Sequence, residues 1–493
     1  MDSGWAGGLR IGRERFPSLP PEAQLCSPMS LVQFCLAVAY IAPFRALRYN
    51  PDRVPLSDVA TQPYDKITPT MQERYYSANP HNLVRIILGK RESSDGPRNN
   101  PYTRAAAWFA DWRQNGVFLH DEHPSLYWYV QSFAAPDGGP ELQRPGFIAL
   151  GKLEDYPANI VFPHERTLAG PKTDRLDLLR ATRAHFGQIF MLYSDPADQI
   201  GAALASGPRA EMPPDMEMRD EYDVLHRLWK ISDPSIIELV QTRMQDKQLI
   251  IADGHHRYET ALNYRNERRA RSEEAVFEDP GKHSAENRRI RHRSGELAPY
   301  EMAMMTFINM DGPGIVILPT HRVVHGLGSF SADGLKAEAR SHFSVEEVDP
   351  SLDSARARSI LREAGHAGTA ILGVARGRAF LFDTPKSFGS HLLAGLSLRQ
   401  QSLDVVLLHK CLLEAALGIS EEAIRSQQHV SYVRDVDEAL SRVRSGGANI
   451  AFLVNPVRMR QVRNIALDGE VLPQKSTDFY PKLLSGLAIY ALE

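Results

Sequence analysis

The chain has 493 residues, of which 43% are hydrophobic and 24% charged, the composition of a globular protein with two or three domains. Its 57 basic side chains nearly balance the 60 acidic ones, which argues against a general electrostatic nucleic-acid binder. The cysteines Cys26, Cys35 and Cys411 form no CxxC pair, so we expect neither a disulfide framework nor a structural zinc site, and a cytoplasmic location fits.

An apolar stretch occupies residues 31–44 near the start of the chain. With basic residues before it, it imitates the hydrophobic part of a secretory signal. It is too short to span a membrane and runs directly into Arg45. We therefore interpret it as leading into a first strand, after an N-terminal extension of residues 1–39, and we expect no membrane association.

An N-terminal α/β region, residues 40–150, mixes short apolar runs with proline-rich turns. Residues 104–115 predict a helix that ends at Gly116. The aromatic run 126–133 predicts a strand, and residues 147–150 predict its neighbour after a loop of glycine and proline.

A second region, residues 151–327, alternates between helix and strand patterns. Strands are predicted at 189–193 and 248–252, and helices at 234–245 and 258–269. Residues 249–252 of the predicted strand at 248–252 are continuously apolar, which is typical of a strand that is buried on both faces.

A charged segment at 270–297 follows, which we interpret as a solvated helix end and a loop. Residues 301–318 return to a strand pattern. The C-terminal α/β region, residues 328–493, alternates strands and helices, with an amphipathic helix predicted at 404–417. Alternation of this kind predicts an α/β fold with mixed sheets.

Five residues that could take part in binding or catalysis directly follow the strand at 248–252: Asp253, Gly254, His255, His256 and Arg257. The N-terminus of the next helix presents unpaired N–H groups that suit an anion. Glycine lets the backbone approach a phosphate, arginine offers a planar fork, and histidines add donors that can be charged or neutral near pH 7. Asp253 could hold Mg²⁺ or accept a proton from a substrate hydroxyl. The turn therefore predicts a phosphate site.

The same turn has simpler interpretations. Asp253 could be only a helix cap, and the histidines could be core or surface residues. Zinc is a further alternative, but adjacent histidines project in different directions and no third ligand lies nearby at standard spacing.

The segment 249–262, Leu-Ile-Ile-Ala-Asp-Gly-His-His-Arg-Tyr-Glu-Thr-Ala-Leu, resembles the bacterial and archaeal family catalogued as domain of unknown function 1015. The charged segment and the N-terminal extension depart from the family pattern. Other segments match it in order, so that the resemblance covers about residues 40–493: Ile41-Ala-Pro-Phe-Arg-Ala-Leu-Arg48, Gln62-Pro-Tyr-Asp65, Asn79-Pro-His-Asn82, His164-Glu165 with Thr167, Pro171-Lys172 with Asp174-Arg175, Pro319-Thr-His-Arg322, Leu472-Pro-Gln-Lys-Ser-Thr477 and Phe479-Tyr-Pro-Lys482.

The turn is also similar to the nucleotide-binding turn of the ParB/sulfiredoxin-like superfamily, which includes CTP-binding partition proteins, ATP-using sulfiredoxins and free-serine kinases. This resemblance implies a ParB/sulfiredoxin-like nucleotide-binding core, with Gly254, His255, His256 and Arg257 on the phosphates. It implies ATP, or ADP or CTP, with Mg²⁺. The turn lacks a cysteine, so sulfinic-acid repair is not expected. The association of family members with serine biosynthesis favours a kinase for serine or a related hydroxy amino acid.

A kinase also needs a general base and substrate anchors. The candidate carboxylates are Asp65, Glu165 and Asp253, and Asp253 is also the candidate metal ligand. The candidate substrate-binding residues are His164, Lys172, Arg175, His321 and Arg322. Each of these side chains is also compatible with a solvated or structural position.

The leading hypothesis is a nucleotide-dependent phosphotransferase that acts on the hydroxyl of a free small molecule. The alternative is a regulatory switch that binds CTP or ATP without phosphotransfer. A nuclease, an activity ascribed to ParB relatives, fits poorly with the near-neutral charge and with the lack of interleaved basic and aromatic residues. We expect a nucleotide and a small-molecule substrate as partners and no nucleic acid, and a homo-oligomer is compatible with the sequence.

Overall fold

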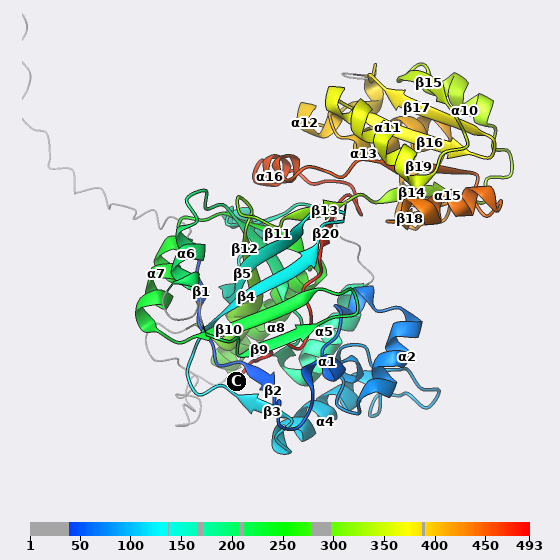
Figure 1. The fold of residues 1–493 in the computed structure, drawn as a ribbon. Helices are drawn as coiled ribbons and strands as arrows, with labels where there is room; N and C mark the ends of the chain where they lie inside the picture. The colour runs from blue at the N-terminus through cyan, green and yellow to red at the C-terminus, as the bar shows by residue number, and fades with distance from the viewer. Residues whose placement is uncertain (1–38, 137, 166–170, 207–211, 279–296, 387–389) are drawn as a thin grey trace, which may run out of the picture. The chain divides into compact units, whose positions relative to one another are not determined.

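The computed structural model describes residues 39–493 except 137, 166–170, 207–211, 279–296 and 387–389. Contacts divide the chain into two units, Met1–Leu36 and Ala37–Glu493. The first unit lies outside the described residues, as do almost all of the predicted extension and most of the charged segment. Helices and mixed sheets make up the second unit (Figure 1), so the predicted α/β class is confirmed.

The larger sheet of the described residues has nine strands. Their order is β6-β11-β8-β12-β5-β4-β10-β9, with β1 beside β5. The pairs β11–β6 and β12–β8 are parallel, and the others are antiparallel. The strands are β1 Ile41–Ala42, β4 Leu126–Ala134, β5 Glu141–Lys152, β6 Val161–Pro163, β8 Ile189–Tyr193, β9 Met216–Arg219, β10 Leu225–Ile231, β11 Leu249–Asp253 and β12 Met302–Asn309.

Strand β12 shows that this sheet is buried on both faces. Met302 and Met304 belong to one apolar cluster, whereas Ala303, Met305 and Phe307 belong to another, because successive side chains of a strand point to opposite faces. Every residue of β12 is buried. This explains why its sequence is mostly apolar and shows no alternation of apolar and polar residues.

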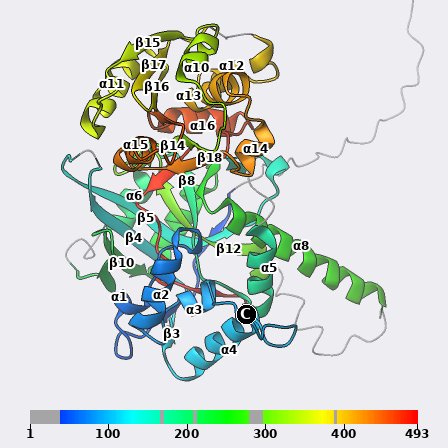
Figure 2. The ribbon, with the colours of Figure 1, turned by 90° about the vertical axis from the view of Figure 1, so that its right-hand side faces the viewer.

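Helices cover this sheet and extend beyond it. They are α1 Leu56–Val59, α2 Pro69–Ala78, α3 Val84–Ile87, α4 Pro101–Gln114, α5 Pro171–Thr182, α6 Gln199–Ala205, α7 Pro234–Met244 and α8 His255–Glu278. Helix α5 packs against α8 (Figure 2) and against α4. The helices predicted at 104–115 and 234–245 are confirmed with small shifts at their ends. The helix predicted at 258–269 begins earlier, directly after Gly254.

The second sheet of the described residues has six antiparallel strands in the order β15-β17-β16-β19-β14-β18. It is also buried on both faces, because Ile371 of β16 joins one apolar cluster and its neighbours Ala370 and Leu372 join another. The strands are β14 His321–Val324, β15 Ser344–Val348, β16 Ala370–Ala375, β17 Arg378–Asp383, β18 Val430–Val433 and β19 Ile450–Val454. The helices of this part are α10 Ala332–Ala339, α11 Ser354–Ala367, α12 Leu398–Gln401, α14 Glu421–Arg425, α15 Val436–Arg444 and α16 Met459–Leu467.

Two local predictions differ from the structure. The helix predicted at 404–417 is α13, Asp404–Leu407, followed by a π-helix at Leu408–Ala416. Over so few turns, the spacing of apolar residues hardly distinguishes an α-helix from a π-helix. From the sequence we also expect Thr320-His321-Arg322 to end a strand, but β14 begins at His321, because Pro319 interrupts the run after β13, Val316–Leu318.

The C-terminal segment pairs with strands from two earlier parts of the chain. Its strand β20, Asp478–Tyr480, pairs with β13, and β21, Tyr490–Ala491, pairs with β7, Ala184–His185. A further pair joins β2, Leu47–Tyr49, to β3, Phe118–His120.

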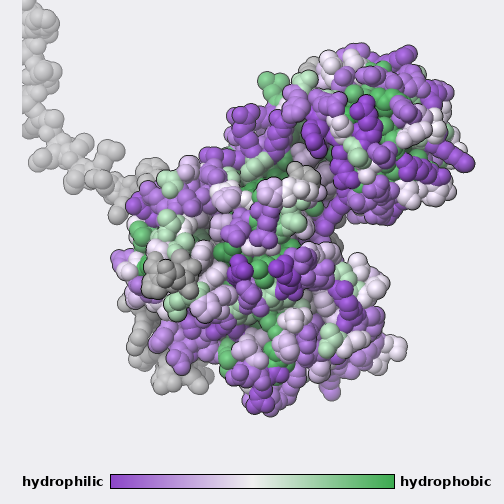
Figure 3. All heavy atoms as spheres, viewed as in Figure 1, coloured by the Kyte–Doolittle hydropathy of each residue, from purple (hydrophilic) through white to green (hydrophobic). Residues whose placement is uncertain are grey.

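Polar residues cover most of the face of the molecule that Figure 3 shows. In the part of the chain that the structure describes, no helix is both long and apolar enough to cross a membrane.

Candidate functional site

In the predicted turn, a single residue, Gly254, connects β11 to α8. Asp253 is the last residue of β11, and α8 begins at His255. Gly254 between them has a φ of +90°, a conformation that side-chain-bearing residues rarely adopt. A Cβ atom added there would lie 2.9 Å from Nε of Arg257. The backbone at this position therefore requires glycine.

The turn opens into a cavity of about 540 Å³. Four other parts of the chain supply most of the rest of its lining: the short 3-10 helix η1, Tyr64–Lys66; residues 164–165 after β6; the segment at the end of β18 with Arg434; and the C-terminal segment from Lys475 to Lys482. Thr320, Gln427 and Arg442 also line the cavity. Eight of the twelve predicted site residues line it, namely Asp65, His164, Glu165, Asp253, Gly254, His255, His256 and Arg257. The cavity thus gathers residues that lie far apart in the sequence.

Asp253 is held between two cations. Its Oδ2 accepts a hydrogen bond from Nη2 of Arg257 at 2.6 Å, and its Oδ1 lies 3.1 Å from Nζ of Lys482. Burial by itself raises the pKa of Asp253, but the charges of Lys482 and Arg257 outweigh burial and hold this pKa below its ordinary value. Asp253 therefore remains ionised at neutral pH.

Lys482 continues the same network towards Asp478. Its Nζ lies 3.0 Å from Oδ1 of Asp478 as well. Burial by itself lowers the pKa of Lys482, but the two carboxylates Asp253 and Asp478 raise it above the ordinary value. Asp478 also pairs with Lys66 at 3.6 Å and accepts a hydrogen bond from Nη2 of Arg434 at 2.8 Å. Burial and the charge of Lys482 lower the pKa of Lys66.

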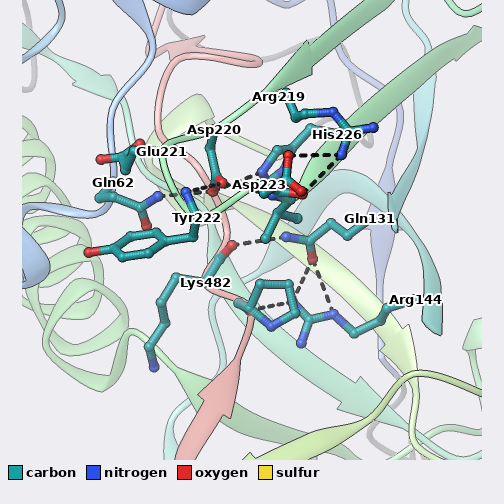
Figure 4. Close-up of polar contacts among 12 residues, drawn as sticks. Gln62, Gln131, Arg144, Arg219, Asp220, Glu221, Tyr222, Asp223, His226 and Lys482 are labelled. Carbon is teal, nitrogen blue, oxygen red and sulfur yellow. Dashed lines mark hydrogen bonds and ion pairs between the residues drawn. The ribbon is translucent and has the colours of Figure 1, made fainter. Parts of the chain in front are cut away.

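Two buried polar side chains of the large sheet hold the backbone that carries Lys482 (Figure 4). Nε2 of Gln131, on β4, donates to the carbonyl of Lys482 at 2.9 Å. Nη1 of Arg144, on β5, donates to the carbonyl of Tyr480 at 2.9 Å, and its Nε donates to Oε1 of Gln131 at 3.1 Å. The side chain of Lys482 extends away from both residues. Its position in the cavity is therefore set by β4 and β5.

A second buried group holds the start of the segment that carries Asp65 (Figure 4). Nε2 of Gln62 donates to Oδ2 of Asp220 at 3.1 Å, and the same oxygen lies 3.2 Å from Nε2 of His226. Burial lowers the pKa of His226, so this ring is neutral and donates from Nε2. Its Nδ1 lies 2.6 Å from the hydroxyl of Tyr129, which donates to it. The turn between β9 and β10 thus anchors Gln62.

His164 connects three parts of the cavity wall. Its Nδ1 donates to the carbonyl of Ile251 at 2.5 Å, and its Nε2 lies 2.6 Å from the hydroxyl of Thr477. Burial lowers its pKa to about 4. His255 is also neutral, because burial holds its pKa well below the ordinary value, and its Nε2 accepts a weak hydrogen bond from the N–H of His164 at 3.4 Å. These two rings are neutral near pH 7.

The two candidate bases lie in different surroundings. The backbone N–H of Lys475 donates to Oε1 of Glu165 at 2.5 Å. Burial raises the pKa of Glu165, which makes this carboxyl a better proton acceptor than an ordinary glutamate. Asp65 lies on η1 and is exposed to the cavity. Arg175 supports η1, because the guanidinium carbon of Arg175 lies 4.1 Å from the centre of the Tyr64 ring.

Three predicted substrate-binding residues lie outside the described lining of this cavity. Arg175 lines a smaller cavity of about 70 Å³, which it shares with Arg257. Arg322 is buried and lines a separate cavity of about 610 Å³, and its Nη2 donates to the carbonyl of Lys475 at 3.1 Å. His321 is buried, its pKa is lowered to about 4 by burial, and its Nδ1 accepts from the N–H of Val454 at 3.3 Å. The side chain of Lys172 lies outside the described residues.

The lining suits an anion better than a bare cation. Six basic side chains face four acidic ones, and both oxygens of Asp253 are already bonded to Arg257 and Lys482. Within the described residues, no three His, Cys, Asp or Glu side chains are placed to hold a metal ion. The protein side of the site therefore fits an anion, and both nucleotide binding and a Mg²⁺ ligand role for Asp253 stay predictions.

The sequence by itself indicates no role for four charged residues of the lining: Lys66, Arg434, Asp478 and Lys482. A signal existed for two of them, because Lys482 ends the motif Phe479-Tyr-Pro-Lys and Lys66 directly follows the motif Gln62-Pro-Tyr-Asp. Arg434 stands in no such motif. Its proximity to Asp478 arises only when the two sheets are formed.

Comparison with solved structures finds distant similarities. A conserved hypothetical protein from Pyrococcus furiosus is 12% identical over 67% of this chain and 90% of its own, with a TM-score of 0.31. Free serine kinase in complex with AMP is 11% identical over 67% of this chain and 86% of its own, with a TM-score of 0.32. A mutant of free serine kinase in complex with ADP is 9% identical over 67% of this chain and 87% of its own, with a TM-score of 0.32. No curated protein matches the chain.

The sequence profile of one family matches residues 41–406, which is most of the described chain and includes β11, Gly254 and the start of α8. The C-terminal segment with Asp478 and Lys482 follows the matched part. The chain belongs to the family described as "Protein of unknown function (DUF1015)".

Proposed function

We propose that this protein is a nucleotide-dependent phosphotransferase that acts on the hydroxyl of a small free molecule, with serine or a related hydroxy amino acid as the acceptor. The observation that carries the proposal is the opening of the turn at Gly254 into a cavity rich in basic side chains, with two carboxylates, Asp65 and Glu165, in the same wall. Phosphoryl transfer requires this combination of anion binding and one proton acceptor.

In this proposal the turn binds the nucleotide phosphates. The N–H groups at the start of α8 and the close approach allowed by Gly254 suit phosphate oxygens. Arg257 adds a fixed positive charge, because its Nη1 donates to the carbonyl of Gln188 and its Nη2 to Asp253. His255, being neutral, contributes hydrogen bonds without charge.

Asp65 is the proposed base. Its carboxylate is exposed to the cavity on a turn that Pro63, Gln62 and Arg175 hold in place, so it is positioned with little loss of entropy on substrate binding. The acceptor hydroxyl loses its proton to Asp65 as its oxygen bonds to phosphorus, and the bond to the leaving nucleotide oxygen breaks with its electron pair. Glu165, with its raised pKa, is the competing candidate.

A pooled assay tests the function. The full chain is incubated with a mixture of hydroxy amino acids and ATP, ADP or CTP in the presence of Mg²⁺, and products are identified by mass. A phosphorylated acceptor is expected, together with nucleotide consumption that depends on the acceptor. Nucleotide binding without acceptor-dependent consumption contradicts phosphotransfer and supports the regulatory alternative. Asp65→Asn serves as the low-turnover reference and Asp52→Asn, an exposed carboxylate outside the cavity lining, as the matched control.

A further inference from the structure

The ion-paired network in the cavity carries an excess of positive charge. Its carboxylates are Asp253 and Asp478, whereas its cations are Arg257, Lys482, Lys66 and Arg434. Asp65 is a further carboxylate, whose charge raises the pKa of Lys66 and of Lys482, but it is exposed. Four cations share these two carboxylates, and an excess of two positive charges in a partly buried network favours the binding of an anion.

Three of these cations converge on Asp478 from separate parts of the chain. Lys66 comes from η1, Arg434 follows β18, and Lys482 belongs to the C-terminal segment. Nζ of Lys66 lies 3.6 Å from Asp478, beyond a good hydrogen bond, so its donors are only loosely engaged by this carboxylate. The side chain of Arg434 is 45% exposed and can present further N–H groups to a ligand.

We propose that Lys66, Arg434 and Lys482 form a second anion site in this cavity, beside the turn, and that it takes the phosphate group of a phosphate monoester. The inference deepens the proposed function and rests on it for one point only, the identity of the monoester as the phosphorylated acceptor. The nucleotide phosphates occupy the turn, and the monoester phosphate occupies the group around Asp478.

The charge and the geometry favour a phosphate over a carboxylate. A phosphate monoester carries a charge of about −1.5 to −2 at pH 7, which matches the excess of two cations, whereas a carboxylate neutralises only one. Two lysines supply point charges, and Arg434, whose Nε and Nη2 contact Asp478, supplies its remaining N–H groups, a combination that serves several phosphate oxygens at once.

Lys482 is prepared for this role before any ligand arrives. Gln131 and Arg144 fix its backbone (Figure 4), and Asp253 and Asp478 hold its Nζ. Its side chain is only 10% exposed. Because little freedom remains to be lost, its contact with a phosphate costs little in ordering.

Inorganic phosphate is the probe for this site. It is titrated by calorimetry into the full chain saturated with ADP, and into Arg434→Gln and Lys482→Met under the same conditions. Phosphate affinity should fall tenfold or more in each variant, whereas ADP affinity should stay within about threefold for Arg434→Gln. Arg425→Gln, a half-exposed and ion-paired arginine at another cavity, is the matched control and should bind phosphate as the parent does. O-phosphoserine should bind more tightly than phosphate and show the same losses.

Unchanged phosphate affinity in Arg434→Gln and Lys482→Met, with melting curves like the parent's, overturns the inference. Displacement of ADP by phosphate, one for one, overturns it as well, because it leaves a single anion site. If ADP does not bind, phosphate is titrated into the protein without ADP, and the phosphate affinities of Arg434→Gln and Lys482→Met are compared with that of the parent in the same way. A parent protein that binds phosphate through these residues but phosphorylates no acceptor contradicts the proposed function and leaves the second anion site standing.

Discussion

Nζ of Lys482 lies 3.1 Å from Oδ1 of Asp253, although 229 residues separate them in the sequence. This contact joins the C-terminal segment to the turn between β11 and α8. Asp253 is therefore an internal counter-ion for Lys482 and Arg257 in the resting protein. Its negative charge holds both cations at the wall of the cavity.

Gly254→Val is expected to abolish nucleotide binding while leaving cooperative unfolding. Valine is disfavoured at a φ of +90°, and its Cβ would lie 2.9 Å from Arg257 Nε, so either the backbone of the turn or the Arg257 side chain must shift. Nucleotide affinity is measured by calorimetry and folding by thermal melting. Gly377→Val is the matched control, because Gly377 also has a positive φ but has open space around it, in the turn between β16 and β17. Normal nucleotide affinity in folded Gly254→Val would remove the turn from the binding site.

Arg257→Lys is expected to weaken nucleotide binding by about 1.5–3 kcal/mol, roughly tenfold or more. Arg257 donates from Nη1 to the carbonyl of Gln188 and from Nη2 to Asp253, and a lysine cannot make both contacts with the same geometry. Calorimetric titration with ATP and ADP provides the measurement. Arg271→Lys, an exposed position on the same helix, should bind like the parent. Equal affinity of Arg257→Lys and the parent would make Arg257 a purely structural residue.

Asp65→Asn is expected to reduce turnover by about 10²-fold or more, the usual cost of removing a general base, with nucleotide affinity near normal. Steady-state turnover with the acceptor found in the pooled assay is compared with that of Glu165→Gln. Full turnover in Asp65→Asn together with its loss in Glu165→Gln would transfer the role of base to Glu165. The hydrogen bond from the Lys475 N–H to Glu165 predicts that Glu165→Gln also shifts substrate affinity, because it disturbs the wall of the cavity.

His164 is expected to make the protein less stable in mild acid. Its pKa is about 4 in the folded chain because it is buried, against an ordinary value of about 6.5 in the unfolded chain. As the pH falls through that range, His164 binds a proton in the unfolded chain but stays neutral in the folded chain. The free energy of unfolding should therefore fall by about 2 kcal/mol between pH 7 and pH 5 from this residue.

Urea unfolding at pH 7, 6 and 5 measures the contribution of His164. The decrease in stability should be smaller in His164→Gln than in the parent, whereas His123→Gln, at an exposed position, should follow the parent. A pH dependence in His164→Gln that equals the parent's would show that His164 protonates as readily in the folded chain as in the unfolded one.

Local pattern and motif account for most of the turn and much of its surroundings. The apolar run before Asp253 is continuous because β11 is buried on both faces, and the glycine after it is required by a positive φ. Steric and burial constraints of this kind depend on residues that are adjacent in the sequence, so a local pattern reveals them. For the same reason the strand at 189–193 was predictable at its observed bounds. The resemblance of the motifs around Asp65, His164 and Glu165 then brought these residues into the prediction, and all three line the cavity.

Only the tertiary structure decided which charges meet. The approach of Lys482 to Asp253 and of Arg434 to Asp478 depends on sheet pairing and on a C-terminal segment held by Gln131 and Arg144, contacts that no local pattern encodes. The position of Arg322 in another cavity depends on which face of β14 carries it. The neutrality of His164 and His255 depends on burial by residues far away in the chain. The amino-acid sequence by itself determined the elements and the chemistry of the turn, whereas long-range packing determined the electrostatics of the site, because charge and pKa respond to neighbours in space.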